Sequence, residues 1–289
     1  MSKQYKKSQN NNERRPSGTL KPNKGLGQNF LIDEEVIEAI VCGSDVSEES
    51  LVVEIGPGTG VLTCPLAEQA GRVVAIELDE RMIEPLRVKT FEYGNVEVIN
   101  EDILQVDLNA LIDSKLKEFG LKDVRIVGNL PYYITTPIIM KLLEMKTKAD
   151  SITVMMQKEV GDRIAAKPGT KESGPITYSV HYYSEVRKIV DVGRECFYPA
   201  PKVDSVVLRM DILSERPVKV KDEEFFFRCI KSGFSQRRKT LLNSMMTLGD
   251  YDKEQIERAL TKSNIETNRR AESLTMEEFA ALAEKLSEE

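Results

Sequence analysis

The segment Leu51–Thr63, with the sequence LVVEIGPGTGVLT, decides the fold of this chain. Its first five residues are apolar or β-branched except for Glu54 and run into a glycine, a pattern typical of a buried parallel strand. A glycine-rich turn follows, and the next stretch, 62–70, predicts a helix. A strand, a glycine turn and a helix in this order predict an α/β unit that carries a ligand at the turn.

Outward from this segment, the alternation of strands and helices repeats along the chain. Helices are expected at 32–41 behind a possible cap at Asp33, from about Glu80, at 136–145 and at 158–166. The expected strands are 51–56, 72–79, 96–102, 124–133, 151–157, 186–192 and 202–212. They predict the α/β class with a seven-stranded, mostly parallel sheet, covered on both faces and binding ligands beyond the carboxyl ends of its strands.

The strand pattern ends at about Glu215, and four helical stretches complete the chain, at 223–234, 239–248, 253–263 and 275–286. We therefore expect a basic flexible tail over 1–24, an α/β domain over 25–213 and a small helical domain over 214–289.

Charge is distributed unevenly along a chain whose net charge is -6. Between Met1 and Gly27 there are seven basic residues and one acidic residue. A second basic cluster, in KSGFSQRRK, consists of Lys231, Arg237, Arg238 and Lys239. Such clusters can neutralise nucleic-acid phosphates, although a run of charge is also a common solvated surface. We expect the second cluster to bind RNA and leave the role of the tail open.

Cysteine and histidine usage argues against a metal site. The four cysteines form no CxxC pair, and the single histidine, His181, lies in a stretch that looks helical and half-buried. No apolar run approaches the roughly 20 residues of a membrane span, and the polar N-terminus does not resemble a secretory signal. A cytoplasmic protein without a metal is expected.

Three strand ends describe a cofactor. Gly56, Gly58 and Gly60 have a G-x-G-x-G spacing, which disfavours a pyrophosphate, and Glu54 could orient the turn or face a ligand ammonium group. Glu77 ends the next strand and could accept hydrogen bonds from ribose hydroxyls. Asp102 ends the third strand and could accept from the amino group of adenine, or it could simply cap a helix. Together these residues predict a nucleoside cofactor without a diphosphate.

The fourth strand runs into the tetrapeptide Asn129-Leu130-Pro131-Tyr132. An adenine amino group is a poor nucleophile because its lone pair is delocalised into the ring. Acceptance of its hydrogen bonds by the Asn129 side chain and the Leu130 carbonyl would draw the nitrogen toward tetrahedral geometry. Pro131 would hold the turn, and Tyr132 would stack on the base. The motif predicts methyl transfer to an exocyclic nitrogen by positioning rather than by a strong base.

These motifs together resemble the small-subunit ribosomal RNA adenine N6,N6-dimethyltransferases. The resemblance extends from Gly27 to Ser244 and includes GQNFL, VEIGPGTGVLT, IELD, NLPY, MQKEV, FYPAPKVDSVV and FSQRRKTLLNS. It implies a Rossmann-like class I methyltransferase fold, and it implies that Phe197 holds the target base against Tyr132. Tyr133 departs from the residue common after NLPY in the family. The implied S-adenosylmethionine ligands are Gln28, Asn29, Leu31, Glu54, Gly56, Gly58, Glu77, Leu78, Asp102, Ile103 and Asn129.

The resemblance also implies a reaction and a partner. A monomer would dimethylate two adjacent adenosines in the hairpin loop near the 3′ end of 16S-type small-subunit rRNA, within an immature 30S subunit. Three alternatives stay open at this point. They are the related class that methylates a large-subunit rRNA adenosine and confers macrolide-type resistance, an assembly factor with little turnover, and a DNA adenine methyltransferase.

Overall fold

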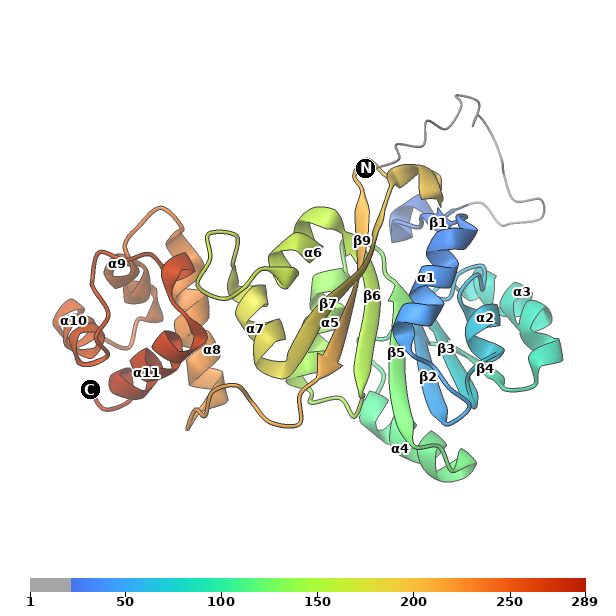
Figure 1. Cartoon of the computed structure of the whole chain (residues 1–289), viewed down its shortest axis with the longest axis horizontal. Coiled ribbons are helices and arrows are strands. Elements are labelled where there is room, and N and C mark those ends of the chain that lie inside the picture. The colour runs from blue at the N-terminus through green and yellow to red at the C-terminus, as the bar shows by residue number, and fades with distance from the viewer. Residues whose placement is uncertain (1–21) are drawn as a thin grey trace, which may run out of the picture.

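The computed structural model describes residues 22–289, and its centre is one seven-stranded sheet (Figure 1). Six strands are parallel and β9 is antiparallel to both of its neighbours, so the predicted mostly parallel α/β sheet is confirmed. In spatial order the strands are β4 (Val96–Asn100), β3 (Arg72–Glu77), β2 (Ser50–Ile55), β5 (Asp123–Asn129), β6 (Ser151–Gln157), β9 (Ser205–Ile212) and β7 (Ser184–Val192).

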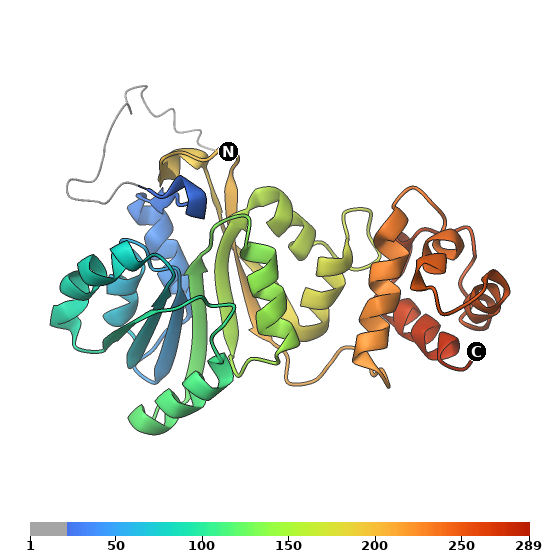
Figure 2. The same cartoon turned by 180° about the vertical axis from the view of Figure 1, so that it is seen from behind.

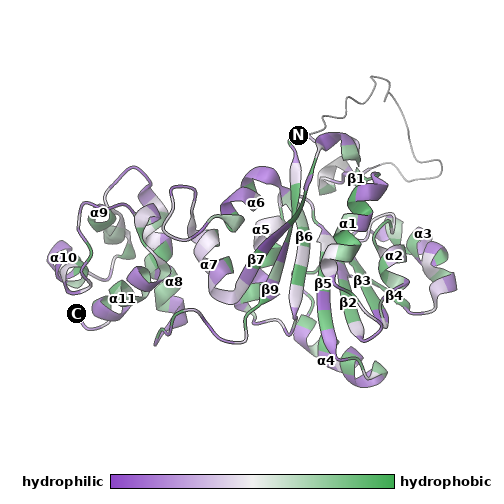
Figure 3. Cartoon of the chain, in the orientation of Figure 1, coloured by the Kyte–Doolittle hydropathy of each residue, from purple (hydrophilic) through white to green (hydrophobic). Residues whose placement is uncertain are grey.

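Alternate residues of the strands pack against different helices, because successive side chains of a strand point to opposite faces. Val52 of β2 packs with α1 (Glu34–Ser44) and α2 (Thr63–Ala67), which lie in front of the sheet in Figure 1. Val53 belongs to the cluster on the other face, where the view from behind shows α4 (Leu108–Phe119) and α5 (Thr135–Glu144) (Figure 2). The central strands are thus covered on both faces, as their mostly apolar sequences predict (Figure 3).

The remaining helices of the α/β region are α3 (Glu80–Thr90), α6 (Lys158–Ala165) and α7 (Pro175–Tyr183). The predicted cap of α1 is confirmed, since the Asp33 carboxylate accepts hydrogen bonds from the amides of Glu35 and Val36.

After β9 the chain forms helices only. They are α8 (Glu223–Gly233), α9 (Leu241–Met245), α10 (Lys253–Lys262) and α11 (Met276–Leu286). They gather at one end of the molecule (Figure 1) and pack on α7 through Tyr178, whose ring contacts those of Phe234 and Phe279. The Tyr178 hydroxyl donates to the Leu274 carbonyl at 2.5 Å. The boundary expected between 213 and 214 falls between β9 and α8, and the division into separate domains stays a prediction.

Several predicted elements end earlier than expected, including the strands predicted over 72–79 and 124–133, which end at Glu77 and Asn129. The helix predicted over 62–70 covers only Thr63–Ala67, because the chain must bend to Gly71, where an added Cβ would lie 2.4 Å from the Glu48 carbonyl oxygen. The third strand ends at Asn100 rather than at Asp102, because the Asp102 side chain and carbonyl both accept amide hydrogen bonds from the following turn. The predicted helix at 239–248 is also split, into α9 and the 3-10 turn Met246–Leu248. Most of the basic tail, residues 1–21, lies outside the described residues.

Candidate active site

A pocket lies beyond the carboxyl ends of β2, β3 and β5, where the order of the sheet reverses direction. Ligands of open α/β sheets bind at such a position. The pocket encloses about 1040 Å³ of empty space, including solvent at its mouth. Every residue that the sequence assigned to the cofactor or to catalysis lines it: Gln28, Asn29, Leu31, Glu54, Gly56, Gly58, Glu77, Leu78, Asp102, Ile103, Asn129, Leu130, Pro131, Tyr132 and Phe197.

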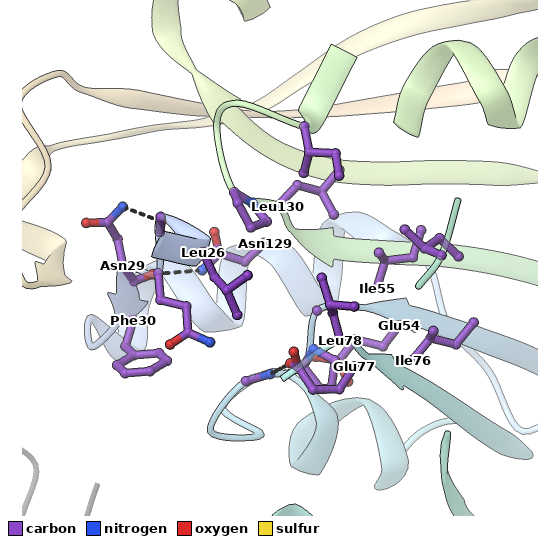
Figure 4. Close-up of a pocket in the computed structure, with 18 of the residues that line it drawn as sticks. Leu26, Asn29, Phe30, Glu54, Ile55, Ile76, Glu77, Leu78, Asn129 and Leu130 are labelled. Atoms are coloured by element: carbon purple, nitrogen blue, oxygen red, sulfur yellow. Dashed lines mark hydrogen bonds between the residues drawn. The ribbon is translucent and has the colours of Figure 1, made fainter. Parts of the chain in front are cut away.

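Glu54 occupies the floor of this pocket (Figure 4). Its side chain is 1% exposed, and its Oε2 atom has no hydrogen-bond partner among the described residues. Burial raises the pKa of Glu54 to about 7, because the charged form loses its hydration and Glu77 adds repulsion. The nearby Thr63 hydroxyl and Lys89 ammonium offset this only in part. An unpaired acceptor in this position is suited to a cationic or hydrogen-bond-donating ligand group.

Glu77 holds the glycine turn against the end of β3. Its Oε2 accepts from the Gly58 amide at 3.0 Å and its Oε1 accepts from the Asp79 amide at 2.8 Å. Burial raises the pKa of Glu77, and these two amides oppose the shift. A carboxylate has about four acceptor positions, so Glu77 retains room for ribose hydroxyls. The turn itself needs glycine at position 60, where φ is 73° and a Cβ would lie 2.7 Å from Leu86.

The turn after β4 forms the opposite wall. The Asp102 Oδ1 atom accepts from the Leu104 amide at 2.9 Å and so caps a turn. The helix-capping alternative is wrong, because α4 begins at Leu108 and is capped by Asp107. Its second oxygen makes no hydrogen bond with the described residues, and Ile103 beside it is buried. Leu78 is 48% exposed although it is apolar, and it borders the pocket on the β3 side. One free carboxylate oxygen between two apolar side chains suits a flat heterocycle with an amino group.

A two-stranded ribbon that the sequence did not indicate closes the pocket. β1 (Phe30–Leu31) pairs antiparallel with β8 (Phe197–Tyr198), which places Leu31 opposite Phe197. Gln28 lies just before this ribbon and donates to Asp79 Oδ2 at 2.9 Å. Segments separated by more than 160 residues thus meet at the edge of this pocket. Strands of two residues carry no periodicity, so the sequence could not predict the pairing.

The tetrapeptide turn leaves β5 on the same side of the pocket. The Asn129 Nδ2 atom donates to the Asn29 carbonyl at 3.5 Å, and no described residue donates to its Oδ1. The Pro131 carbonyl accepts from the Ile134 amide and from the Thr135 hydroxyl, each at 3.1 Å. The Tyr132 hydroxyl pairs with Ser205 of β9 at 2.7 Å, which fixes its ring. The turn is therefore held from both sides with a side-chain acceptor left available.

The second basic cluster lies away from this pocket. Lys231 is exposed on α8, and Arg237, Arg238 and Lys239 are exposed in the segment between α8 and α9. None of the four forms an ion pair with another residue of the described part of the chain. They make a solvated basic surface on the helical region, whose role as an RNA contact stays a prediction.

The single histidine and the four cysteines lie outside the pocket lining. His181 is half-buried on α7, its Nε2 lies 3.1 Å from the Ile164 carbonyl, and burial lowers its pKa. Cys42, Cys64, Cys196 and Cys229 are free thiols. Within residues 22–289, no group of three or more potential ligands that could hold a metal ion is found, and no helix has the length and apolarity needed to cross a bilayer.

The sheet order and the polar groups at its switch point define a Rossmann-like methyltransferase. A family model described as ribosomal RNA adenine dimethylase matches residues 19–288. The chain belongs to this family, and it is an rRNA adenine dimethyltransferase.

Similar proteins agree with this assignment. A ribosomal RNA small subunit methyltransferase A from Geobacillus sp. (strain WCH70) is 47% identical over 91% of this chain and 91% of its own. A dimethyladenosine transferase from Plasmodium falciparum has a similar structure, with a TM-score of 0.72 and 25% identity over 88% of this chain and 95% of its own. The 23S rRNA methyltransferase ErmE has a TM-score of 0.68 and 25% identity over 90% of this chain and 100% of its own.

Proposed function

We propose that this enzyme transfers methyl groups from S-adenosylmethionine to N6 of two adjacent adenosines in the 3′-terminal hairpin loop of small-subunit rRNA. One observation carries the proposal. The acceptor turn of Asn129 and Leu130 opens into the same pocket as the candidate ribose acceptor Glu77 and the candidate adenine acceptor Asp102. A bound adenosyl group and a target amino group would therefore meet at the end of β5.

The pocket residues fit the donor. When bound, S-adenosylmethionine supplies an electrophilic methyl group on a sulfonium. The unpaired Glu54 oxygen suits its cationic end, Glu77 suits the ribose and Asp102 suits the adenine amino group. Leu78 and Ile103 offer apolar surface to the base. From β2 to β4, these hydrogen-bond acceptors come in the same order as the parts of S-adenosylmethionine that they suit, from its amino-acid part through the ribose to the adenine.

Asn129 performs the central chemical role. Its Oδ1 accepts one hydrogen bond from the target amine, and the Leu130 carbonyl accepts the second. Two acceptors outside the ring plane favour a nitrogen whose lone pair points at the methyl group. Because both acceptors are fixed before the base arrives, they cost little reorganisation during transfer.

Tyr132 and Phe197 hold the target base. Phe197 is 3% exposed and stands in the ribbon with Leu31, while Tyr132 is fixed through Ser205. A base enters such a slot only when it is unstacked, so a hairpin loop is a better substrate than a duplex. The exposed cluster of Lys231, Arg237, Arg238 and Lys239 contacts rRNA phosphates outside the slot.

The small subunit is favoured over the large one. The relative named for the small subunit is 47% identical to this chain, whereas the similar 23S rRNA enzyme is 25% identical. We propose that the enzyme works as a monomer in the cytoplasm on immature 30S subunits.

The test uses two ribosomal subunits. Undermethylated 30S subunits and 50S subunits are incubated separately with the protein and S-adenosylmethionine, and the rRNA is digested for mass spectrometry. Dimethyladenosine at two neighbouring positions near the 3′ end of the small-subunit rRNA is expected, with none in the 50S sample. Methylation confined to the 50S subunit would refute the proposed substrate, and methylation of neither would refute the function.

A further inference from the structure

Lys141 lies on α5, outside the cofactor pocket, and its ammonium group ends among backbone carbonyls. The Nζ atom donates to the carbonyl oxygens of Ile103 at 3.0 Å, Leu104 at 2.5 Å and Val106 at 3.3 Å. An ammonium group has three N–H donors, so all of them are used. Lys141 is half-buried and forms no ion pair within residues 22–289. A lysine held in this way stabilises the turn that it contacts, and it is not simply a solvated surface charge.

That turn carries the two candidate adenine contacts. Asp102 begins it, with its Oδ1 bonded to the Leu104 amide, and its carbonyl accepts from the amides of Gln105 at 2.7 Å and Val106 at 3.2 Å. The amide end of the turn is thus held by Asp102, and the carbonyl end is held by Lys141. A cation at converging carbonyls is favourable because it complements their aligned dipoles.

The helix that carries Lys141 is also attached to the acceptor turn. The Thr135 hydroxyl, in the first turn of α5, donates to the Pro131 carbonyl. Ile138, one helical turn further, lines the pocket and is 2% exposed, and Lys141 follows it at i+3. One short helix therefore contacts the methyl-acceptor end of the site, its middle and the adenine turn in succession.

We propose that Lys141 is a positioning residue for the cofactor, which fixes the Asp102–Ile103 turn at the distance from Asn129 that the adenosyl group requires. It touches neither substrate nor cofactor, and it acts through the three carbonyls. This inference rests on the proposed function, because it takes the pocket to be an adenosyl site. Loss of the ammonium group frees the turn, so the Asp102 oxygen no longer meets the adenine amino group in a fixed place.

The experiment compares two ligands in calorimetry of the full chain. One is S-adenosylhomocysteine, and the other is the same thioether with unsubstituted purine in place of adenine. Lys141→Met keeps the unbranched four-atom stem of the side chain and removes the ammonium donors. We expect this substitution to lower the affinity for S-adenosylhomocysteine about tenfold. The ratio of the affinities for the adenine and purine ligands should then be close to one. Lys141→Arg, which keeps the charge and the donors, should restore part of the ratio.

Lys148→Met is the matched control, because Lys148 follows the same helix but pairs with the exposed Asp113. It should leave both affinities unchanged. The proposal would be overturned if Lys141→Met left the affinity ratio unaltered. An equal loss of affinity for both ligands is such an outcome, and a general structural role predicts it. If Lys141→Met does not fold, Lys141→Leu, which also lacks side-chain donors, carries the same comparison. Wild-type protein that binds neither ligand would instead refute the proposed function.

Discussion

The pocket and the helical region use polar side chains in opposite ways. In the pocket, Glu54 and Glu77 are 1% and 6% exposed, and they are aimed at a space that a ligand can fill. In the helical region, Arg237 and Arg238 are exposed. Burial makes each pocket group energetically expensive when it is unpaired, whereas a solvated charge costs little. The comparison teaches that the chemistry should depend on single residues, and that rRNA affinity should depend on many small contributions.

The largest effect is expected for Asn129→Ala. Removal of the fixed side-chain acceptor should lower kcat by roughly 100-fold to 1000-fold, the range seen when one preorganised polar contact to a transition state is lost. Cofactor affinity should change little. Single-turnover methylation and calorimetry measure the two quantities. Asn109→Ala is the control, because the Asn109 amide bonds Lys148 and Met145 outside the pocket. Unchanged turnover in Asn129→Ala would remove this residue from catalysis.

Glu77→Ala comes next, with its effect on binding. The substitution leaves the Gly58 and Asp79 amides without their acceptor and removes the candidate ribose contact. The ribose would lose two charge-assisted hydrogen bonds to the Glu77 carboxylate, at about 1.5 kcal/mol each. This loss should raise the dissociation constant of S-adenosylmethionine about 100-fold. Calorimetry checks this result. Glu84→Ala on the exposed side of α3 should have no effect, and an equal dissociation constant in both variants would contradict the assignment.

Glu54 should make cofactor affinity depend on pH. Burial raises its pKa to about 7, and a cationic ligand favours the ionised form. Below pH 7 the group must first lose its proton, so affinity should fall roughly tenfold between pH 8 and pH 6. Calorimetry in two buffers should also detect proton release at pH 6. Glu54→Gln should abolish the dependence, and an equally steep profile in that variant would assign it to another group.

The same shift predicts an effect on stability with a defined sign. Because the folded-state pKa is raised from 4.5, the stability contributed by neutral Glu54 is complete below pH 4.5 and is lost as pH rises through about 7. The loss is on the order of 3 kcal/mol at most, from about 1.4 kcal/mol per pH unit. Glu54→Gln should therefore melt at a higher temperature than wild type at pH 8. Equal melting temperatures at pH 8 would contradict this.

The smallest effect belongs to the helical region. Arg237→Ala combined with Arg238→Ala should weaken rRNA binding several-fold and reduce the slope of log affinity against log salt by roughly 1 to 2. Cofactor affinity should stay the same. The control pair is Arg258→Ala with Lys262→Ala, since both of these residues already pair with Glu289. Equal salt slopes in the two double variants would exclude the cluster from the interface.

The sequence predicted the elements whose signal is local. The strands at 51–55 and 151–157 are runs of mostly apolar or β-branched residues, and the cap at Asp33 is a short-range pattern, so both could be predicted without tertiary contacts. The third strand was predicted two residues too long, because Asp102 satisfies a turn that no propensity describes. The two-residue ribbon of β1 and β8 was missed altogether, since its only support is pairing across the fold.

By itself, the sequence determined the sheet, the family motifs and the residue types at each strand end. Hydrophobic periodicity and turn chemistry depend on residues that are close together in the chain. Only the tertiary structure decided that Phe197 would face Leu31, that Gln28 would bond Asp79, and that Lys141 would bond the carbonyls of the turn after β4. These contacts join segments far apart in the chain. Their geometry depends on how the sheet and its helices pack, and no local pattern encodes that packing.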